Sequence, residues 1–338
     1  MDYSKKLFVL LLSCMTLIFN YNNIYSVSAA ASVVGLNYGL LGNNLPSPSD
    51  VIKFYKSQNV VKIRIFEPNK DILEALRGNR EIGVIVGIKN EDLKALAANK
   101  DAVKTWFATN IDPYVSEVNI TFITVGNQAI PGDENGPYVF PVMQSLTNIV
   151  KSRNLPILIS TTITTTSLAA LKPPSAAVLT PLARKQLFPV LKLLSLSSTP
   201  ILVNIYPYYF YVADPKNVPL EYANFNTDKV VVKDGSLSYT NMFDAIFDGF
   251  LWAMEKEEVR NVPLVVSETG WPSAGNGDKT TPALQYTYNG NFVKHVASGK
   301  GTPKRPNSRI DGYIFETYNE NQKPDGIYQH FGLFDPTA

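Results

Sequence analysis

Short apolar, β-branched runs alternate with segments of helical periodicity along most of this chain, and this alternation limits the possible folds more than any other feature. Eight such runs can be recognised, at residues 33–38, 61–66, 83–88, 122–127, 156–163, 200–206, 263–268 and 311–318. Helical patterns separate them, at residues 48–59, 70–77, 91–115 (broken near Pro113), 139–153, 185–197, 241–259 and 282–299. The sequence therefore predicts an α/β fold, a single (β/α)8 TIM barrel.

The region after the sixth run is irregular and rich in tyrosine. It covers residues 206–237, which is longer than an ordinary connection, so we expect a small insertion after strand 6 of the barrel. A doubly wound open sheet is the alternative fold, but residues 38–43 match its glycine-rich phosphate turn poorly. Since no hinge-like linker divides the chain, we expect one barrel domain over residues 31–338.

The first 30 residues have the pattern of a secretory signal peptide. Lys5 and Lys6 precede an apolar run at residues 7–19, and small residues follow at 28–30. We expect cleavage near Ala30 and an extracellular protein, in the apoplast or cell wall. The apolar run is shorter than the roughly 20 residues that a membrane-spanning helix needs, and no later run approaches that length, so no membrane anchor is expected.

The composition leaves little material for several kinds of chemistry. The single cysteine, Cys14, lies in the signal peptide, and the two histidines, His295 and His330, are isolated. Zinc sites and histidine-activated nucleophiles therefore have few candidate residues. A formal charge of +2 without a basic run argues against nucleic-acid binding. We expect a monomer without metal or cofactor, whose hydrolytic chemistry would come from carboxylates.

The carboxyl ends of the strands carry the candidate functional residues, because a barrel gathers those ends on one face. The seventh run delivers the Glu268 carboxylate and, three residues later, the Trp271 ring. The other ends supply Tyr38, Glu67, Asn127, Gln128, Thr161, Thr162, Tyr206, Tyr208, Glu320 and Lys323. Aromatic rings with amides and carboxylates are typical of sugar-binding sites. The alternative interpretation is a buried, paired glutamate beside core aromatic residues.

Ser267-Glu268-Thr269-Gly270-Trp271-Pro272-Ser273 closely resembles the signature of plant glycoside hydrolase family 17, the endo-1,3-β-glucanases. Further blocks of resemblance lie at residues 38–46, 125–127, 204–208, 301–306 and 331–334, so the similarity covers nearly all of the chain after the signal peptide. The resemblance implies a barrel enzyme that hydrolyses 1,3-β-D-glucans (callose, laminarin, fungal wall glucan) with retention of configuration.

The resemblance also implies roles for individual residues. Glu268 would be the nucleophile, and Asn127 would bind the 2-hydroxyl of the sugar. Glu320 and Lys323 resemble an auxiliary segment near the nucleophile, where a lysine ammonium would keep Glu268 ionised; a salt bridge at the rim is the alternative. Tyr38, Tyr206 and Trp271 are the remaining predicted substrate-binding residues. Asn119, in Asn119-Ile120-Thr121, is the predicted glycosylation site.

One position departs from the family pattern. The family has Val-Gly-Asn-Glu at the end of the fourth strand, where the glutamate is the general acid/base, but this chain has Gln128 there. A neutral amide cannot protonate the leaving group, and general acid–base catalysis contributes about 10²–10⁴-fold. Glu134, in the following loop, is the least implausible substitute. Three interpretations stay open: an impaired glucanase, a non-catalytic β-1,3-glucan-binding protein (sensor, decoy or lectin-like), or a glucanase altered at this position by engineering or error.

Overall fold

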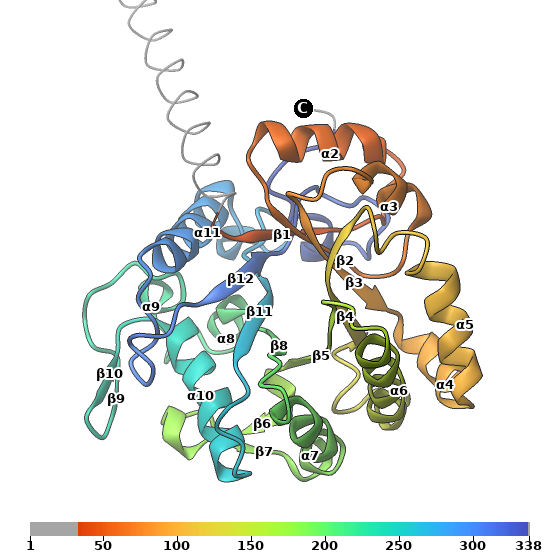
Figure 1. The fold of residues 1–338 in the computed structure, drawn as a ribbon. Coiled ribbons are helices and arrows are strands. Elements are labelled where there is room, and N and C mark those ends of the chain that lie inside the picture. The colour runs from red at the N-terminus through yellow and green to blue at the C-terminus, as the bar shows by residue number, and fades with distance from the viewer. Residues whose placement is uncertain (1–32, 337–338) are drawn as a thin grey trace, which may run out of the picture.

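The computed structural model describes residues 33–336, which form a closed barrel of parallel strands surrounded by helices (Figure 1). The strands follow one another around the barrel in chain order, and β12 closes it against β1. They are β1 (Gly35–Tyr38), β2 (Lys62–Ile65), β3 (Gly83–Ile88), β4 (Asn119–Asn127), β5 (Leu158–Thr164), β8 (Ile201–Asn204), β11 (Leu264–Thr269) and β12 (Asp311–Ile314). The predicted (β/α)8 barrel is confirmed, while the predicted signal peptide lies outside the described residues.

The main helices cover the outside of the barrel, as the ring of coiled ribbons in Figure 1 shows. They are α2 (Pro48–Ser57), α3 (Lys70–Leu76), α4 (Leu93–Ala97), α5 (Lys100–Asn110), α6 (Val139–Ser152), α7 (Pro181–Ser195), α10 (Met242–Lys256) and α11 (Pro282–Ala297). Across residues 33–336, no helix combines the length and the apolar character that crossing a membrane would require.

The break predicted near Pro113 is wrong, because the chain leaves the helix at Ala98 and Asn99 instead. The Asn99 side chain accepts a hydrogen bond from the Ala102 amide (2.8 Å) and so caps a new helix, α5. Pro113 is the more conspicuous helix breaker in the sequence, but the cap at Asn99 decides where the helix is interrupted.

The loops at the carboxyl ends contain short elements of their own. The tyrosine-rich region, expected at residues 206–237, contains α8 (Pro207–Ala213), α9 (Leu220–Ala223) and a hairpin of β9 (Val232–Asp234) with β10 (Leu237–Tyr239). A second hairpin, β6 (Leu168–Ala169) with β7 (Val178–Leu179), follows β5 and was not expected from the sequence. The 3₁₀ helices are η1 (Asn90–Asp92), η2 (Gly136–Tyr138), η3 (Thr165–Ser167), η4 (Pro174–Ala176), η5 (Gly277–Lys279) and η6 (Ile327–Gln329).

The barrel interior changes from apolar to polar along the strands. A small apolar cluster of Ile85, Leu202, Val265 and Tyr313 is contributed by strands on opposite sides of the barrel. Two residues further along, Leu202 and Val265 are followed by Asn204 and Ser267, which are buried and hydrogen-bonded to each other (2.7 Å). Because side chains alternate along a strand, these residues lie one layer nearer the carboxyl ends. The apolar layer therefore supports a polar floor beneath the site.

A buried carboxylate, Asp248 of α10, ties this helix to distant parts of the chain. It accepts hydrogen bonds from the Tyr239 hydroxyl (3.0 Å), the Lys304 amide (2.9 Å) and the Thr302 hydroxyl. Burial raises the pKa of Asp248 from its ordinary value of 3.8 to about 6, although these hydrogen bonds oppose the change. The folded protein therefore holds a proton on Asp248 in a pH range where the unfolded chain does not.

This pKa predicts a pH-dependent contribution to stability. The stabilising contribution of Asp248 grows as pH falls from about 6 towards 4. It is lost as pH rises through the pKa of Asp248 in the folded protein, because burial disfavours the ionised carboxylate. Asp248→Asn should therefore gain melting temperature relative to the wild type as pH rises from about 4 to 7. Thermal unfolding of both proteins across this range checks the expectation. A difference in melting temperature that does not change with pH would contradict the assignment.

Candidate active site

A cleft of about 490 Å³ lies at the carboxyl ends of the barrel strands. Its lining joins residues from β5, α8 and β11 and from the segments after β4, β5, β8 and β12: Gln128, Thr164, Thr165, Thr166, Tyr206, Tyr209, Phe210, Glu268, Phe315, Tyr328 and Phe331. Six of these are aromatic, and Glu268 is the one carboxylate among them. The lining brings together Glu268, Gln128 and Tyr206, three of the residues that the sequence placed at the carboxyl ends of the strands.

An irregularity in β11 aims Glu268 into the cleft. The pairing register of β11 shifts after Val266 against both neighbouring strands, β8 and β12. Ser267 already faces the interior, where it bonds Asn204, so strict alternation would turn Glu268 outward. The bulge lets two successive side chains face inward, which is a known way of re-aiming a functional residue.

Strand β4 uses a similar device at its carboxyl end. Its register against β5 shifts between Thr124 and Asn127, and Gly126 has φ of +74° in between. Gln128 also has a positive φ (+56°), and its amide donates to the Thr162 carbonyl (2.9 Å). As a result, Asn127 faces Glu268 from within the barrel while the exposed Gln128 lines the cleft.

Three side chains donate hydrogen bonds to the Glu268 carboxylate. The Arg64 guanidinium donates to Oε1 at 2.5 Å, and the Asn127 amide reaches the same oxygen at 3.2 Å. The Tyr206 hydroxyl donates to Oε2 at 3.0 Å. Burial and the neighbouring Glu268 charge raise the pKa of Tyr206 well above its usual range, so it stays a proton donor. The three donors hold the Glu268 carboxylate in one orientation, as a nucleophile requires.

Arg64 is the functional residue that the sequence analysis missed. Its side chain is 1% exposed, and besides Glu268 it donates to the amide oxygens of Asn37 (3.2 Å) and Asn127 (3.1 Å). The prediction that a lysine accompanies the nucleophile is therefore corrected: the cation is Arg64 of β2, which is separated from β11 by β12 and β1. The signal was present, because Lys62 and Arg64 alternate with Ile63 and Ile65, which indicates an inward-facing charge.

Glu320 and Lys323 belong to a separate cluster with Glu316. Lys323 donates to both Glu316 oxygens (2.7 and 2.8 Å) and pairs with Glu320. Burial raises the pKa of Glu316 well above its usual range, helped by its hydrogen bond with Glu320. Burial works against ionisation of Glu320 too, but that hydrogen bond and the Lys323 charge lower its pKa. In the described part of the chain neither Glu320 nor Lys323 bonds Glu268, and neither lines the cleft.

The cluster still contacts the cleft from behind. The Lys323 ammonium lies 4.3 Å from the centre of the Phe315 ring, and Phe315 is part of the cleft wall. The cluster therefore supports a wall rather than presenting a second acid to a substrate. These contacts match neither the auxiliary role that the resemblance implied nor the alternative of a salt bridge at the rim, because the cluster is buried.

Trp271 and Tyr38 do not face the cleft. Trp271 is 0% exposed, packs with Tyr208 and Tyr288, and donates from Nε1 to the Lys279 carbonyl (3.0 Å). The chain reaches this position through Gly270, where a Cβ would lie 2.4 Å from the Phe315 carbonyl oxygen. Tyr38 is buried against Tyr55. The predicted sugar platform at Trp271 is corrected, since a covered ring cannot stack on a substrate.

Trp271→Phe tests this packing role. The variant loses one hydrogen bond and leaves a small cavity, so we expect its unfolding free energy to fall by about 1–3 kcal/mol. Its affinity for laminari-oligosaccharides should stay within about twofold of the wild type, because no sugar contact is removed. Urea unfolding and calorimetric titration measure the two quantities. Weaker sugar binding at unchanged stability would restore Trp271 as a platform.

The aromatic residues that do line the cleft come from loops that the sequence reasoning did not resolve. Tyr209 and Tyr328 are partly exposed there, and Tyr206, Phe315 and Phe331 pack edge to face in contact with one another. Partly exposed rings beside packed ones give a wall that is both rigid and able to stack on sugar faces. The sequence shows that these rings follow β8 and β12, the sixth and eighth strands of the barrel, but it does not show which of them stay exposed.

The other candidate carboxylates lie elsewhere. Glu134 is exposed and does not line the cleft, and Glu67 is paired with Lys89. Asn119 is half-buried at the start of β4, at the opposite end of that strand from the site, and donates to the Arg80 carbonyl (3.2 Å). Within residues 33–336 no group of three or more His, Cys, Asp or Glu is placed to hold a metal ion.

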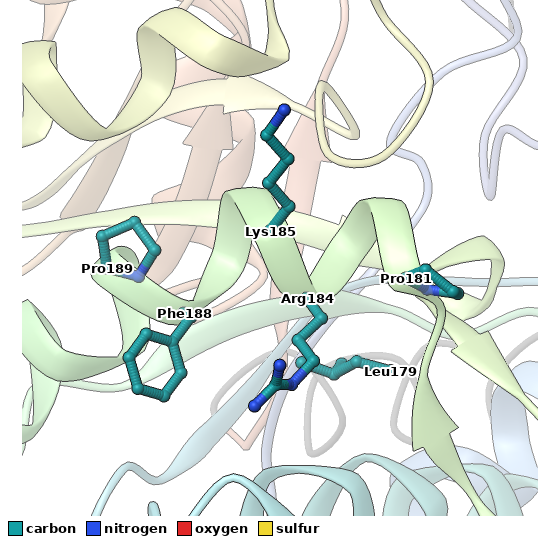
Figure 2. A pocket seen from close by; sticks show the side chains of 6 residues that line it. All are labelled: Leu179, Pro181, Arg184, Lys185, Phe188 and Pro189. Atoms are coloured by element: carbon teal, nitrogen blue, oxygen red, sulfur yellow. The ribbon is translucent and has the colours of Figure 1, made fainter.

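A second depression, of about 540 Å³, lies on α7 and is a poor candidate (Figure 2). Its lining consists of Leu179, Pro181, Arg184, Lys185, Phe188 and Pro189. Figure 2 shows Lys185 pointing away from Arg184 and Phe188, so the polar groups do not converge. The Arg184 guanidinium is bound to both oxygens of Glu257 (2.8 and 2.9 Å). The cleft around Glu268 is therefore the candidate site.

Comparison with known proteins agrees with this geometry. The family model described as glycosyl hydrolases family 17 matches residues 34–338. "Probable glucan endo-1,3-beta-glucosidase BG4" of Arabidopsis thaliana is 65% identical over 333 residues, 98% of this chain and 96% of that protein. A glucan endo-1,3-beta-glucosidase of Vitis vinifera is 39% identical over 317 residues, 92% of this chain and 91% of its own.

Two solved structures are similar over nearly their whole length. CJP38, a beta-1,3-glucanase and allergen of Cryptomeria japonica pollen, has a TM-score of 0.86 at 40% identity, covering 90% of this chain and 96% of that one. A plant beta-glucan endohydrolase, one of two described as having distinct substrate specificities, has a TM-score of 0.85 at 37% identity. It covers 90% of this chain and 97% of its own.

Proposed function

This chain belongs to family 17 of the glycosyl hydrolases, and from that premise we propose that it binds β-1,3-glucan and cleaves it slowly, with Glu268 as nucleophile and with retained configuration. The observation that carries the proposal is the state of Glu268 in the cleft. Three side chains donate hydrogen bonds to its carboxylate, and the described lining of the cleft contains no second carboxylate. Retaining hydrolysis normally needs two carboxyl groups.

Gln128 explains why cleavage is slow rather than absent. It lines the cleft together with Glu268, on a strand that lies across the barrel mouth from β11, where a general acid would be needed. Its amide can donate a hydrogen bond to the glycosidic oxygen but cannot transfer a proton to it. Attack by Glu268 is retained, whereas departure of an unprotonated sugar alkoxide is costly. The buried Glu316 is bound by Lys323 within its own cluster and does not line the cleft, so it offers no substitute.

The proposal predicts tight binding together with covalent reactivity at a single residue. Laminari-oligosaccharides should bind, and a 2-deoxy-2-fluoro-β-laminaribioside with a dinitrophenolate leaving group should label Glu268, because that leaving group needs no proton. Calorimetric titration and peptide mass spectrometry measure the two outcomes, with Glu268→Gln as the unlabelled control. Binding without labelling would favour the other candidate, a non-catalytic β-1,3-glucan-binding protein. Absence of both would reject the proposal.

The non-catalytic candidate is favoured by one observation, the exposed tyrosines of the cleft. Tyr209 and Tyr328 are about half exposed at its wall and can stack on sugars without any chemistry. The three donors on Glu268 favour the catalytic candidate instead, because a binding role does not need an oriented carboxylate. We further propose that the protein acts outside the cell, which its N-terminal signal pattern supports.

A further inference from the structure

We propose that this site transfers β-glucosyl groups between anions. The donors would be 1-O-acyl β-glucosides, which are esters of the anomeric hydroxyl with a carboxylic acid, and the acceptors would be carboxylates. The inference rests on the proposed function, since it uses the same nucleophile, Glu268. The reaction differs from glucan hydrolysis, because glycosyl transfer between anions needs no general acid or base.

The transfer balances without any proton. In the first step a Glu268 oxygen attacks C1 of the donor, the bond from C1 to the acyl oxygen breaks, and the electron pair leaves with the carboxylate. In the second step an oxygen of another carboxylate attacks C1, and the electron pair of the breaking bond returns to Glu268. Two displacements retain the β configuration. The amide at Gln128 is no obstacle in either step, whereas hydrolysis needs a base to activate water.

The environment of Glu268 favours an anionic acceptor once the glucosyl-enzyme has formed. Esterification removes the charge of Glu268, and the side chains to which Arg64 still donates are the neutral amides of Asn37 and Asn127. Arg64 is 1% exposed, so its charge is then poorly screened by water. Because the described lining of the cleft contains no other charged side chain, the cleft becomes positive and attracts anions.

The polar part of the cleft lining has matching chemistry. Gln128, Thr164, Thr165 and Thr166 supply amide and hydroxyl groups there. These groups are neutral hydrogen-bond donors, which suit a departing or arriving carboxylate. A glutamate at position 128 would repel the same anion. The substitution that impairs hydrolysis therefore makes the cleft more suitable for anionic partners.

The first test measures which nucleophiles release the glucosyl-enzyme. The donor is 2,4-dinitrophenyl β-laminaribioside, and the added nucleophiles are azide and formate (anions) or methanol and hydroxylamine (neutral at pH 7). We expect about 1 M azide to raise turnover at least about tenfold and to yield β-laminaribiosyl azide, with less than about twofold from the neutral compounds. The Gln128→Glu variant should lose the azide effect, and Glu268→Gln should show no turnover.

The second test follows exchange between carboxylates directly. The protein is incubated with 1-O-benzoyl β-laminaribiose and isotopically labelled benzoate, and the label entering the ester is measured against Glu268→Gln. Label in the ester at a rate that depends on Glu268 supports the inference. If the fluorinated reagent labels Glu268 but neither the glycosyl azide nor labelled ester forms, the inference is overturned and the proposed function stands. Failure of that labelling overturns both.

Discussion

Gln128→Glu should raise laminarin hydrolysis at least about a hundredfold, because it restores a group that can protonate the leaving oxygen and then activate water. A hundredfold gain corresponds to about 2.7 kcal/mol of activation free energy. The position is suited to this role, since Gln128 lines the cleft that Glu268 enters and its backbone is fixed by the bond to Thr162. Reducing-end release from laminarin measures the rate, and the affinity for laminari-oligosaccharides should change little.

Two comparisons separate acid–base catalysis from a general effect of charge. Gln128→Asp places the same charge one methylene short, so we expect less than about a tenth of the gain of Gln128→Glu. With the dinitrophenyl donor, the rate of Glu268 glycosylation should be nearly equal in wild type and Gln128→Glu, since that leaving group needs no proton. Equal laminarin rates in the wild type and Gln128→Glu would contradict the role assigned to position 128.

Arg64→Met should destabilise the protein by about 3–5 kcal/mol, because it leaves the Glu268 carboxylate buried without a cation. Arg64 and Glu268 are 1% and 4% exposed and are joined at 2.5 Å, so little water can replace the lost partner. Labelling of Glu268 by the fluorinated reagent should also slow, since one oxygen loses its shortest hydrogen bond. Denaturant unfolding and labelling kinetics measure the two effects.

Lys62→Met is the matched control on the same strand. Lys62 also forms an ion pair, with Asp311 at 2.5 Å, but both side chains are partly exposed. Partly solvated pairs contribute little, so we expect a loss below about 1 kcal/mol and unchanged labelling of Glu268. An Arg64→Met variant no less stable than Lys62→Met would show that the Arg64–Glu268 pair does not support the fold.

The barrel could be predicted from the sequence because its signal is repeated. Each strand is a short apolar run bounded by polar or turn residues, and eight of them with helices between leave few other architectures. The position of Glu268 at the end of a strand was predictable for the same reason. The boundary at Asn99 was not, since a single capping side chain decided it against a more conspicuous proline.

The environment of the site was less predictable, because it depends on which way side chains face. Trp271 follows Glu268 closely in sequence, yet the turn through Gly270 buries its ring under Tyr208 and Tyr288. Arg64 is far from Glu268 in sequence, and its contact arises only when the barrel closes. Lys323 carried the expected charge but found nearer acids in Glu316 and Glu320. Residue types along one chain do not decide between such partners.

The bulge in β11 also makes the protein sensitive to changes of length in a way that substitutions do not reveal. Ser267 and Glu268 both face inward only because the strand carries one residue more than its neighbours require. Deleting Ser267 would restore regular pairing and alternation, with Glu268 in the inward place of Ser267, deeper in the barrel and withdrawn from the cleft. The deletion variant would then have a more regular barrel but no activity, because regular pairing of β11 is incompatible with Glu268 in the cleft.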